Sequence, residues 1–218
     1  RRRESDGRYI WASCVIHLLK EAVTGELKGF AYVTDIDDQK KHELSLQYSA
    51  ERDLLTGLYN RHTAERLIRE LLQAGEKDAL HAFLMIDLDD FKAVNDTLGH
   101  IFGDAVLSEI AKKIRGIFRK SDIVGRIGGD EFVVFLRDIP QIEHAVAKAE
   151  ELCREFRAAY AGENGTYKIS GSIGIAYFPS DGVTFDELYG KADLALYAAK
   201  HKGKDACAVY RDVLPEHT

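Results

Sequence analysis

The sequence predicts an α/β (α+β) fold in which helices flank a central mixed sheet. Short apolar stretches alternate with longer amphipathic ones from about residue 53 onward, which is the pattern of a sheet covered by helices. Two of the apolar stretches are joined directly across Gly128-Gly129. A glycine pair between two such runs indicates an antiparallel hairpin, so the sheet is predicted to be mixed.

Composition limits the classes of function. The 218 residues are 45% hydrophobic and 30% charged, which is ordinary for a globular protein. The net charge of −6 gives no hint of the basic face that a nucleic-acid binder carries. No apolar run is long enough to span a membrane. We expect a cytoplasmic chain with reduced cysteines and no direct membrane contact. It lacks an initial Met and resembles a piece of a longer protein, which can be membrane-tethered elsewhere.

Three segments are predicted along the chain. Residues 1–37 contain two β-prone runs, the first from Arg8 and the second over residues 28–36. Residues 38–52 lack Gly and Pro and suit a connector helix, one that is able to pair with a second copy of itself. The main domain is predicted at 53–214.

The elements of the main domain follow from periodicity. Helices are expected where apolar residues recur every three or four positions, and strands where short apolar runs end in turn signals. The predicted helices are 63–74, 104–118, 142–159 and 185–201, and the predicted strands are 79–87, 123–127, 131–136, 167–178 and 207–210.

Two acidic clusters follow predicted strands. The strand at 79–87 ends in Asp87, and the hairpin turn projects Asp130 and Glu131. Because ligands bind where strands of an α/β sheet end, these carboxylates can converge. Clustered carboxylate oxygens suit Mg²⁺, with nucleotide phosphates completing its coordination. Taken singly, either cluster is equally well explained as a solvated acidic loop.

Several separated motifs together resemble one family. The Gly-Gly-Asp-Glu-Phe run at 128–132, preceded by Arg126, closely resembles the signature of GGDEF domains, the diguanylate cyclases, and further segments match that family in order. These are residues 53–61 (Asp-Leu-Leu-Thr-Gly-Leu-Tyr-Asn-Arg), 85–104, 170–176 and 192–200. The resemblance covers about three quarters of the chain and implies the GGDEF fold, which is similar to the nucleotidyl cyclase and polymerase palm.

The resemblance implies roles for individual residues. Asp87 and Asp130 match the side-chain ligands of two Mg²⁺ (or Mn²⁺) ions, with the Leu88 carbonyl as a backbone ligand. Lys92 matches a lysine that stabilises the transition state. Asp130 and Glu131 are the candidates for assisting deprotonation of the attacking hydroxyl, and the sequence does not decide between them.

Substrate contacts are implied in the same way. Asn95 and Asp104 match the residues that read the guanine edge, where a carboxylate accepts from donors that adenine lacks. The remaining implied substrate contacts are Phe91, Gly128, Gly129, Lys200 and Lys204.

The resemblance implies a reaction and its partners. Two GTP molecules, one on each domain of a homodimer, condense to cyclic di-GMP and two pyrophosphates. Arg119 and Asp122 have the spacing of the family's inhibitory product site; a helix-end cation followed by a capping Asp is the alternative. Two departures stand out, Lys204 where the family usually has Arg and Cys153 where it often has a second inhibitory Arg.

The N-terminal strands also resemble a known domain. Their motifs look like the last strands of a PAS sensor domain, whose larger part is absent from this chain. These motifs begin at Asp6, Thr24 and Thr34. Two alternatives to a cyclase stay open: a catalytically silent GGDEF domain that binds GTP or cyclic di-GMP as a receptor, and a pure dimerisation module.

Overall fold

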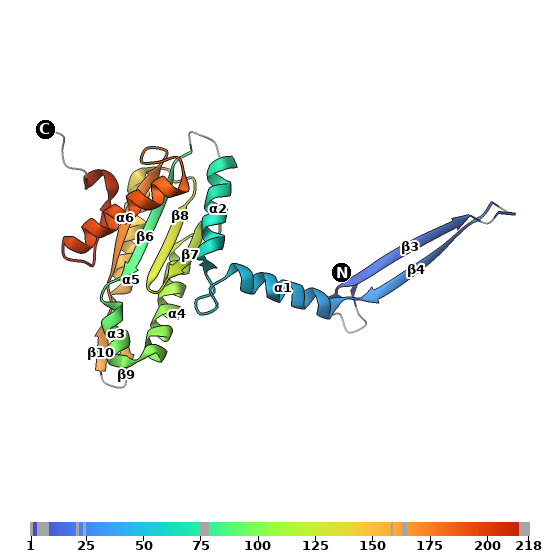
Figure 1. Cartoon of the computed structure of the whole chain (residues 1–218), viewed down its shortest axis with the longest axis horizontal. Helices are drawn as coiled ribbons and strands as arrows, with labels where there is room; N and C mark the ends of the chain where they lie inside the picture. Colours follow the sequence, from blue (N-terminus) through green and yellow to red (C-terminus); the bar gives the residue numbers. More distant parts are fainter. Residues whose placement is uncertain are drawn as a thin grey trace. The chain divides into compact units, whose positions relative to one another are not determined.

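The computed structural model describes residues 2–3, 9–20, 22–23, 25–74, 79–157, 159–162 and 165–213 (Figure 1). The chain divides into two compact units, Arg1–Ala50 and Glu51–Thr218. The predicted strand start at Arg8 and the predicted domain end at 214 lie outside the described residues.

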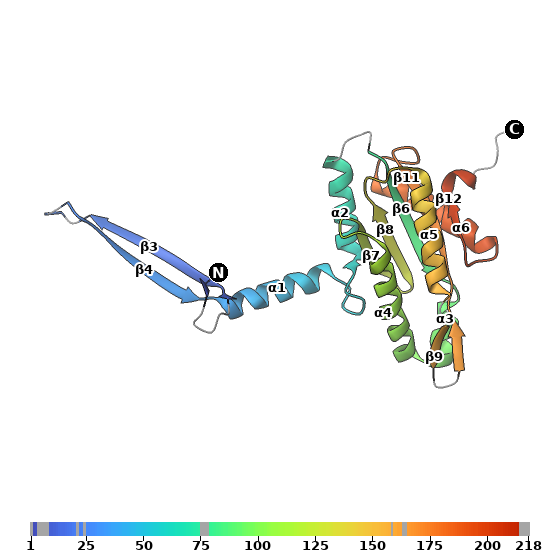
Figure 2. The same ribbon diagram turned by 180° about the vertical axis from the view of Figure 1, so that it is seen from behind.

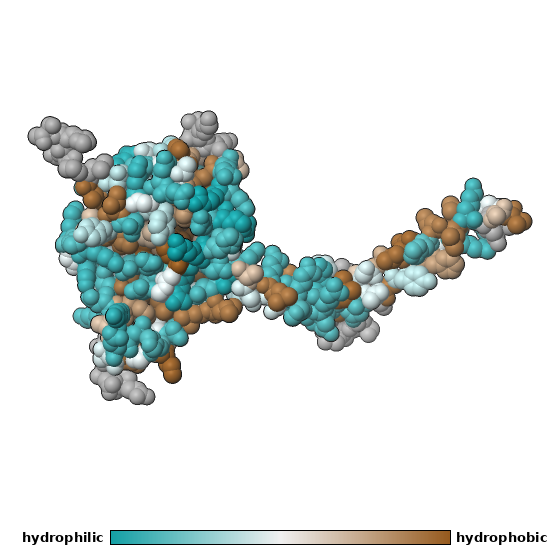
Figure 3. All heavy atoms as spheres, viewed as in Figure 1, coloured by the Kyte–Doolittle hydropathy of each residue, from teal (hydrophilic) through white to brown (hydrophobic). Residues whose placement is uncertain are grey.

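The first unit is built on one long hairpin. Its strands β3 (Ala12–Lys20) and β4 (Leu27–Asp35) pair antiparallel, with Ala12 opposite Asp35 and Lys20 opposite Leu27. Both faces of this hairpin expose large apolar side chains, among them Ile16 and Tyr32. Figure 3 shows hydrophobic residues along the face of the hairpin that is in view. The elements of this part of the chain are β1 (Arg2–Arg3), β2 (Tyr9–Ile10), β3 (Ala12–Lys20), β4 (Leu27–Asp35) and the helix α1 (Asp37–Glu51).

The second unit alternates strands and helices, as predicted. Its elements are β5 (Tyr59–Asn60), α2 (Arg61–Ala74), β6 (His81–Leu88), α3 (Phe91–Leu98), α4 (His100–Ile117), β7 (Ile123–Gly128), β8 (Glu131–Leu136), α5 (Ile142–Phe156), β9 (Ala159–Gly162), β10 (Gly165–Lys168), β11 (Gly171–Phe178), α6 (Phe185–His201), β12 (Cys207–Val209) and a 3₁₀ turn (Tyr210–Asp212).

One sheet of six strands organises this unit, in the order β12-β11-β6-β8-β7-β5. The two outer pairs, β11 with β12 and β5 with β7, are parallel. The three inner pairs are antiparallel. The predicted mixed sheet is therefore confirmed, and its central strand β6 lies between the hairpin strand β8 and β11.

Helices cover both faces of the sheet. β6 is buried along its whole length, and its side chains alternate between two cores. On one face Leu84 and Ile86 pack with apolar residues of α4 and α5. On the other face Phe83 and Met85 pack with apolar residues of α2 and α6. Figures 1 and 2 show these two faces in turn.

α6 approaches the sheet closely at Gly174 of β11. A Cβ atom placed there would lie 2.0 Å from the backbone oxygen of Ala192 and 2.3 Å from the nitrogen of Leu196. Because backbone atoms cannot move aside as a side-chain end does, only glycine lets the helix lie this close. This packing fixes the distance between α6 and β11.

The largest differences from the sequence prediction lie around two of the helices. The helix predicted from Asp104 begins at His100, and the short helix α3 precedes it. The helix predicted to 159 ends at Phe156, and the strand predicted from 167 begins at Gly171. Between them lies a small hairpin, β9 and β10, with four registered pairs, which includes the last residue of that predicted helix and the first two of that predicted strand.

Two simpler expectations also have an outcome. The three cysteines are free, as predicted. In the part of the chain that the structure describes, no helix combines the length and the apolarity that crossing a bilayer requires.

Acid is expected to destabilise the fold through His81, the first residue of β6. His81 is buried, and its Nδ1 accepts a hydrogen bond from the backbone N–H of Asp138 (2.9 Å). Burial lowers the pKa of His81, and the Asp138 carboxylate only partly opposes this. The unfolded chain therefore binds the proton first, so stability is full above the ordinary pKa of about 6.5 and falls as pH drops below it.

Thermal unfolding at about pH 7.5 and about pH 6.0 tests this. The melting temperature of the wild type should be lower at the lower pH. His81→Asn, whose side-chain oxygen keeps a hydrogen-bond acceptor, should show a smaller decrease. His100→Asn, at an exposed position of α4, should keep the wild-type difference. Equal differences in all three proteins would contradict the role of His81.

Candidate functional site

Three carboxylates meet at one edge of the sheet. Asp87 is the next-to-last residue of β6, and it is paired in register with Glu131, the first residue of β8. Asp130 lies in the turn before β8, and its carbonyl accepts from the backbone N–H of Leu88 (3.3 Å). The end of β6 and the hairpin turn are thus neighbours. This backbone pairing brings the positions of Asp87 and Asp130 together, as the prediction of their convergence requires.

Proximity and burial shift the acidity of this cluster. Burial raises the pKa of Asp87, and the charges of Asp130 and Asp89 raise it further, against the opposing hydrogen bond and charge of Lys200. Burial and the charges of Asp87 and Asp130 likewise raise the pKa of Glu131. Lys200 reaches in from α6, its Nζ 2.8 Å from Oδ1 of Asp87. Lys200 therefore offsets only part of the effect that burial and the neighbouring carboxylates have on Asp87.

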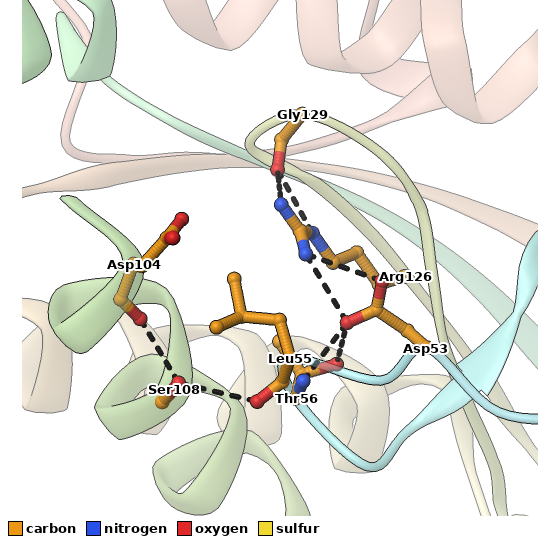
Figure 4. Close-up of polar contacts among 7 residues, drawn as sticks. All are labelled: Asp53, Leu55, Thr56, Asp104, Ser108, Arg126 and Gly129. Atoms are coloured by element: carbon orange, nitrogen blue, oxygen red, sulfur yellow. Dashed lines mark hydrogen bonds and ion pairs between the residues drawn. The ribbon is translucent and has the colours of Figure 1, made fainter. Parts of the chain in front are cut away.

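The side chain of Arg126 holds the hairpin turn through hydrogen bonds. Its Nε and Nη2 donate to the carbonyl oxygen of Gly129 (2.9 and 2.7 Å). Its Nη1 contacts both carboxylate oxygens of Asp53 (3.1 and 3.2 Å). Figure 4 shows this guanidinium between the turn and Asp53. One side chain thus fixes the peptide that precedes Asp130.

Asp53 is itself held in place. The backbone N–H and the hydroxyl of Thr56 donate to its Oδ1 (2.9 and 2.6 Å). Burial acts to raise the pKa of Asp53, but the hydrogen bonds from Thr56 and Arg126 outweigh it and lower the pKa. Asp53 therefore stays ionised and keeps its pairing with Arg126 at neutral pH.

The predicted guanine-reading residues lie on two consecutive helices. Asn95 is on α3, and its carbonyl accepts from the N–H of Gly99 between the helices (2.9 Å). A Cβ atom at Gly103 of α4 would lie 1.9 Å from Oδ1 of Asn95, so this glycine makes room for the amide. Asp104 is exposed beside it. Ser108, one turn further on, has its Oγ 3.2 Å from the Leu55 carbonyl (Figure 4).

The other predicted substrate contacts lie around the same edge. Phe91 is buried at the start of α3 and packs into the core, whereas Lys92 beside it is exposed. Lys204, in the turn after α6, has its Nζ 2.6 Å from Oδ1 of Asp90. Gly128 and Gly129 are exposed in the hairpin.

The donor set of the cluster fits a divalent cation bound together with a nucleotide. Over the described residues, no three His, Cys, Asp or Glu side chains form a ready-made metal site. Two carboxylates, Asp87 and Asp130, and the Leu88 carbonyl supply only part of a shell, which leaves positions for phosphate oxygens and water, as Mg²⁺ prefers. Burial and the repulsion of Asp130 and Asp89 raise the pKa of Asp87, and such a cation would offset the repulsion.

The predicted inhibitory residues have different surroundings. Asp122 is buried, and its carboxylate accepts from the backbone N–H groups of Arg119 (2.8 Å) and Arg137 (3.3 Å). This is the capping geometry that the sequence left open as an alternative. The guanidinium of Arg119 is exposed and makes no hydrogen bond or ion pair within the described ranges. Lys120, Ser121 and Asp122 line a cavity of about 680 Å³.

Sequence reasoning did not single out three residues of this region. Asp53, Arg126 and Asp89 all lie within quoted motifs, but no role was assigned to them. Asp53 and Arg126 are 73 positions apart in the chain, and no local pattern relates them. Asp89 contacts residues 81, 83 and 116 positions away. Only the fold reveals these partners.

Comparison with known proteins gives a consistent result. The family described as "Diguanylate cyclase, GGDEF domain" matches residues 50–206. The chain is 42% identical over 157 residues to the bifunctional diguanylate cyclase/cyclic di-GMP phosphodiesterase MucR of Pseudomonas aeruginosa, covering 72% of this chain and 23% of that protein. It is 42% identical over 162 residues to the diguanylate cyclase TpbB of the same species, covering 73% of this chain and 37% of that protein.

Solved structures agree with these sequence matches. The GGDEF domain of TpbB superposes with a TM-score of 0.69 at 38% identity, covering 73% of this chain and 94% of that one. The GGDEF domain of DgcB from Caulobacter crescentus, in complex with c-di-GMP, superposes with a TM-score of 0.65 at 27% identity, covering 74% and 93%. Because the family match spans most of the chain and the predicted fold is observed, this chain belongs to the GGDEF family of diguanylate cyclase domains.

Proposed function

We propose that this chain is an active diguanylate cyclase, which condenses two GTP molecules into cyclic di-GMP and two pyrophosphates. The observation that carries the proposal is the juxtaposition of Asp87 with the turn that holds Asp130, in register across β6 and β8. A degenerate domain that serves as a receptor has no need of this cluster, in which burial and the charge of Asp130 raise the pKa of Asp87 and of Glu131.

Divalent cations are the proposed partners of the cluster. Asp87, Asp130 and the Leu88 carbonyl would hold Mg²⁺ or Mn²⁺, which when bound polarises phosphoryl oxygens and lowers the pKa of a nearby hydroxyl. Lys200 contacts Asp87 in this structure. With substrate present, we expect its ammonium group to bind the phosphates instead, together with Lys92 and Lys204.

The protein's own groups orient the nucleotide and accept its proton. Asn95 and Asp104 would bind the guanine edge. The 3′-hydroxyl of one GTP attacks the α-phosphate of the other and expels pyrophosphate, and the reverse attack then closes the ring. Glu131 or Asp130 would take the hydroxyl proton. The raised pKa of Glu131 brings that carboxylate closer to the range in which a general base works well.

Each domain would bind one GTP, so two copies must face each other for either bond to form. This makes the homodimer part of the catalytic mechanism, because the two reacting groups are positioned by different chains.

Incubation with GTP and Mg²⁺, followed by chromatography of the nucleotides, tests the proposal. We expect cyclic di-GMP to form, with a rate per protein molecule that rises steeply with protein concentration. GTP that stays intact at high protein concentration, while it raises the melting temperature of the protein, would favour a silent receptor domain. A chain that neither turns GTP over nor is stabilised by it would favour a dimerisation module.

Feedback inhibition is proposed at Arg119 and Asp122. The exposed guanidinium of Arg119 lies on a loop that Asp122 and Arg115 hold by hydrogen bonds, so it is available to bind a guanine or phosphate of the product. Arg119→Ala should weaken inhibition by added cyclic di-GMP about tenfold, the effect of losing roughly 1.4 kcal/mol of binding free energy. The initial rate without product should not change.

A dose–response curve of cyclic di-GMP on the initial rate measures this effect. Arg154→Ala, at an exposed position of α5, is the matched control and should leave the curve unchanged. Identical curves for Arg119→Ala and the wild type would exclude the site.

The N-terminal hairpin is proposed to be part of a PAS sensor domain. A lone hairpin buries little apolar surface, and strands β3 and β4 expose apolar side chains on both faces. This supports a hairpin that is one portion of a larger sheet. We propose accordingly that a sensor regulates this cyclase through α1.

A further inference from the structure

Asp89, the residue that follows β6, ties together three segments that are distant in the chain. Its side chain is buried, with 6% of its surface exposed. Its carboxylate accepts from the hydroxyls of Ser170 and Ser172 (both 2.7 Å) and from the backbone N–H of Asp205 (3.0 Å). Its own N–H donates to the carbonyl of Ser170 (2.9 Å). Both oxygens therefore have protein partners, and Asp89 is not free to bind a metal or a substrate.

The Asp205 contact holds a turn with an unfavourable backbone conformation. Gly203, Lys204 and Asp205 follow one another with φ values of 121°, 64° and 50°. For residues other than glycine, such left-handed conformations are energetically unfavourable. The hydrogen bond to Asp89 and an ion pair between Asp205 and Arg157 (2.7 Å) offset this cost. Without them, we expect the turn to relax.

This turn carries Lys204 to the substrate edge. The Nζ of Lys204 is 2.6 Å from Oδ1 of Asp90, next to Asp89 and three positions after Asp87. The conformation of the turn thus decides whether the ammonium group lies beside the carboxylate cluster or projects into solvent.

We infer that Asp89 is a positioning residue for triphosphate binding, which sets the Lys204 turn so that this lysine reaches the substrate's phosphates. The inference rests on the proposed function, because it takes GTP as the ligand of this edge. Asp89 touches neither substrate nor metal in this role. It acts through Lys204, so the two residues should be energetically coupled.

A double-mutant cycle measures that coupling. Asp89→Asn, Lys204→Ala and the double variant would be compared with the wild type. Binding of two ligands is measured, GMP and a GTP analogue. In the analogue a methylene group replaces the α,β-bridging oxygen, and this replacement blocks turnover. Asp89→Asn should weaken binding of the GTP analogue about tenfold, as expected for the loss of one charge-assisted hydrogen bond. GMP affinity should stay within about twofold, and the double variant should bind no more weakly than Lys204→Ala.

Arg157→Ala is a second, milder variant, because it loosens the same turn through an exposed ion pair and leaves Asp89 intact. It should weaken binding of the GTP analogue about threefold and spare GMP. Equal losses for GMP and the GTP analogue in Asp89→Asn would overturn the inference, since Asp89 would then support the whole site. So would a further tenfold loss when Asp89→Asn is added to Lys204→Ala.

These measurements separate the inference from the proposed cyclase activity. A wild-type chain that binds the analogue but makes no cyclic di-GMP from GTP would refute the activity, and the binding cycle would still decide the role of Asp89. If the activity is confirmed, the same variants should raise the KM for GTP more than they lower kcat.

Discussion

Replacing Asp130 with alanine is expected to reduce the formation of cyclic di-GMP at least about 100-fold. The proposed metal ligands include only two side-chain carboxylates, so the loss of one leaves the cations under-coordinated. A bound cation contributes several kcal/mol of stabilisation to a phosphoryl-transfer transition state, and about 3 kcal/mol corresponds to roughly a 100-fold change in rate. Initial rates in Mg²⁺, with product separated by chromatography, give the comparison.

The fold should tolerate this change. Within the described residues the Asp130 carboxylate makes no hydrogen bond or ion pair, so the melting temperature should change little. Asp130→Asn, which keeps the shape and removes the charge, should lose nearly as much activity. Glu109→Gln, an exposed carboxylate on α4 that pairs with Lys112, should retain full activity. Near-normal turnover by Asp130→Ala would refute its role as a metal ligand.

Substituting Gly103 with alanine is expected to weaken GTP binding about tenfold by displacing Asn95. The added methyl group would lie 1.9 Å from Oδ1 of Asn95, and the end of a short side chain gives way more easily than a helix backbone does. Asn95 should therefore rotate out of its guanine-reading position, at a cost of one or two hydrogen bonds, or roughly 1.4 kcal/mol. The preference for GTP over ATP should fall by the same factor in competition assays.

Gly116 offers a matched control on the same helix. A Cβ atom there meets nothing within 4 Å, so Gly116→Ala should add about 0.5–1 kcal/mol of stability through helix propensity and leave nucleotide selectivity unchanged. A Gly103→Ala protein with wild-type selectivity would show that Asn95 does not read the base.

The long elements of the main domain were predictable because their apolar periodicity is strong. α5 and α6, and the hairpin of β7 and β8, occur close to where the sequence indicates them. α3 was missed because it is only eight residues long and contains Asn95, Asp96 and Thr97, whose side chains compete with helical hydrogen bonds. The hairpin of β9 and β10 was missed because its short strands continue an adjacent helix and strand pattern.

The candidate site was predictable in part. Asp87 and Asp130 stand out because acidic residues follow predicted strands, whereas Asn95 and Lys200 are candidates only through the resemblance to GGDEF domains. What the sequence could not supply was the support around them. Arg126 contacts Asp53 only because folding brings the hairpin next to the turn after α1. Such contacts depend on tertiary packing, which no local pattern encodes.

One consequence concerns how the reach of a lysine is determined. Lys200 extends from α6 to within 2.8 Å of Asp87. The distance between that helix and β11 is set where the helix backbone packs against Gly174. A methyl group at that strand position would lift the helix as a rigid rod, and the ammonium group would be carried away from the acidic edge with it. The spacing between cation and carboxylate is thus set by Gly174 of β11, which belongs to neither partner.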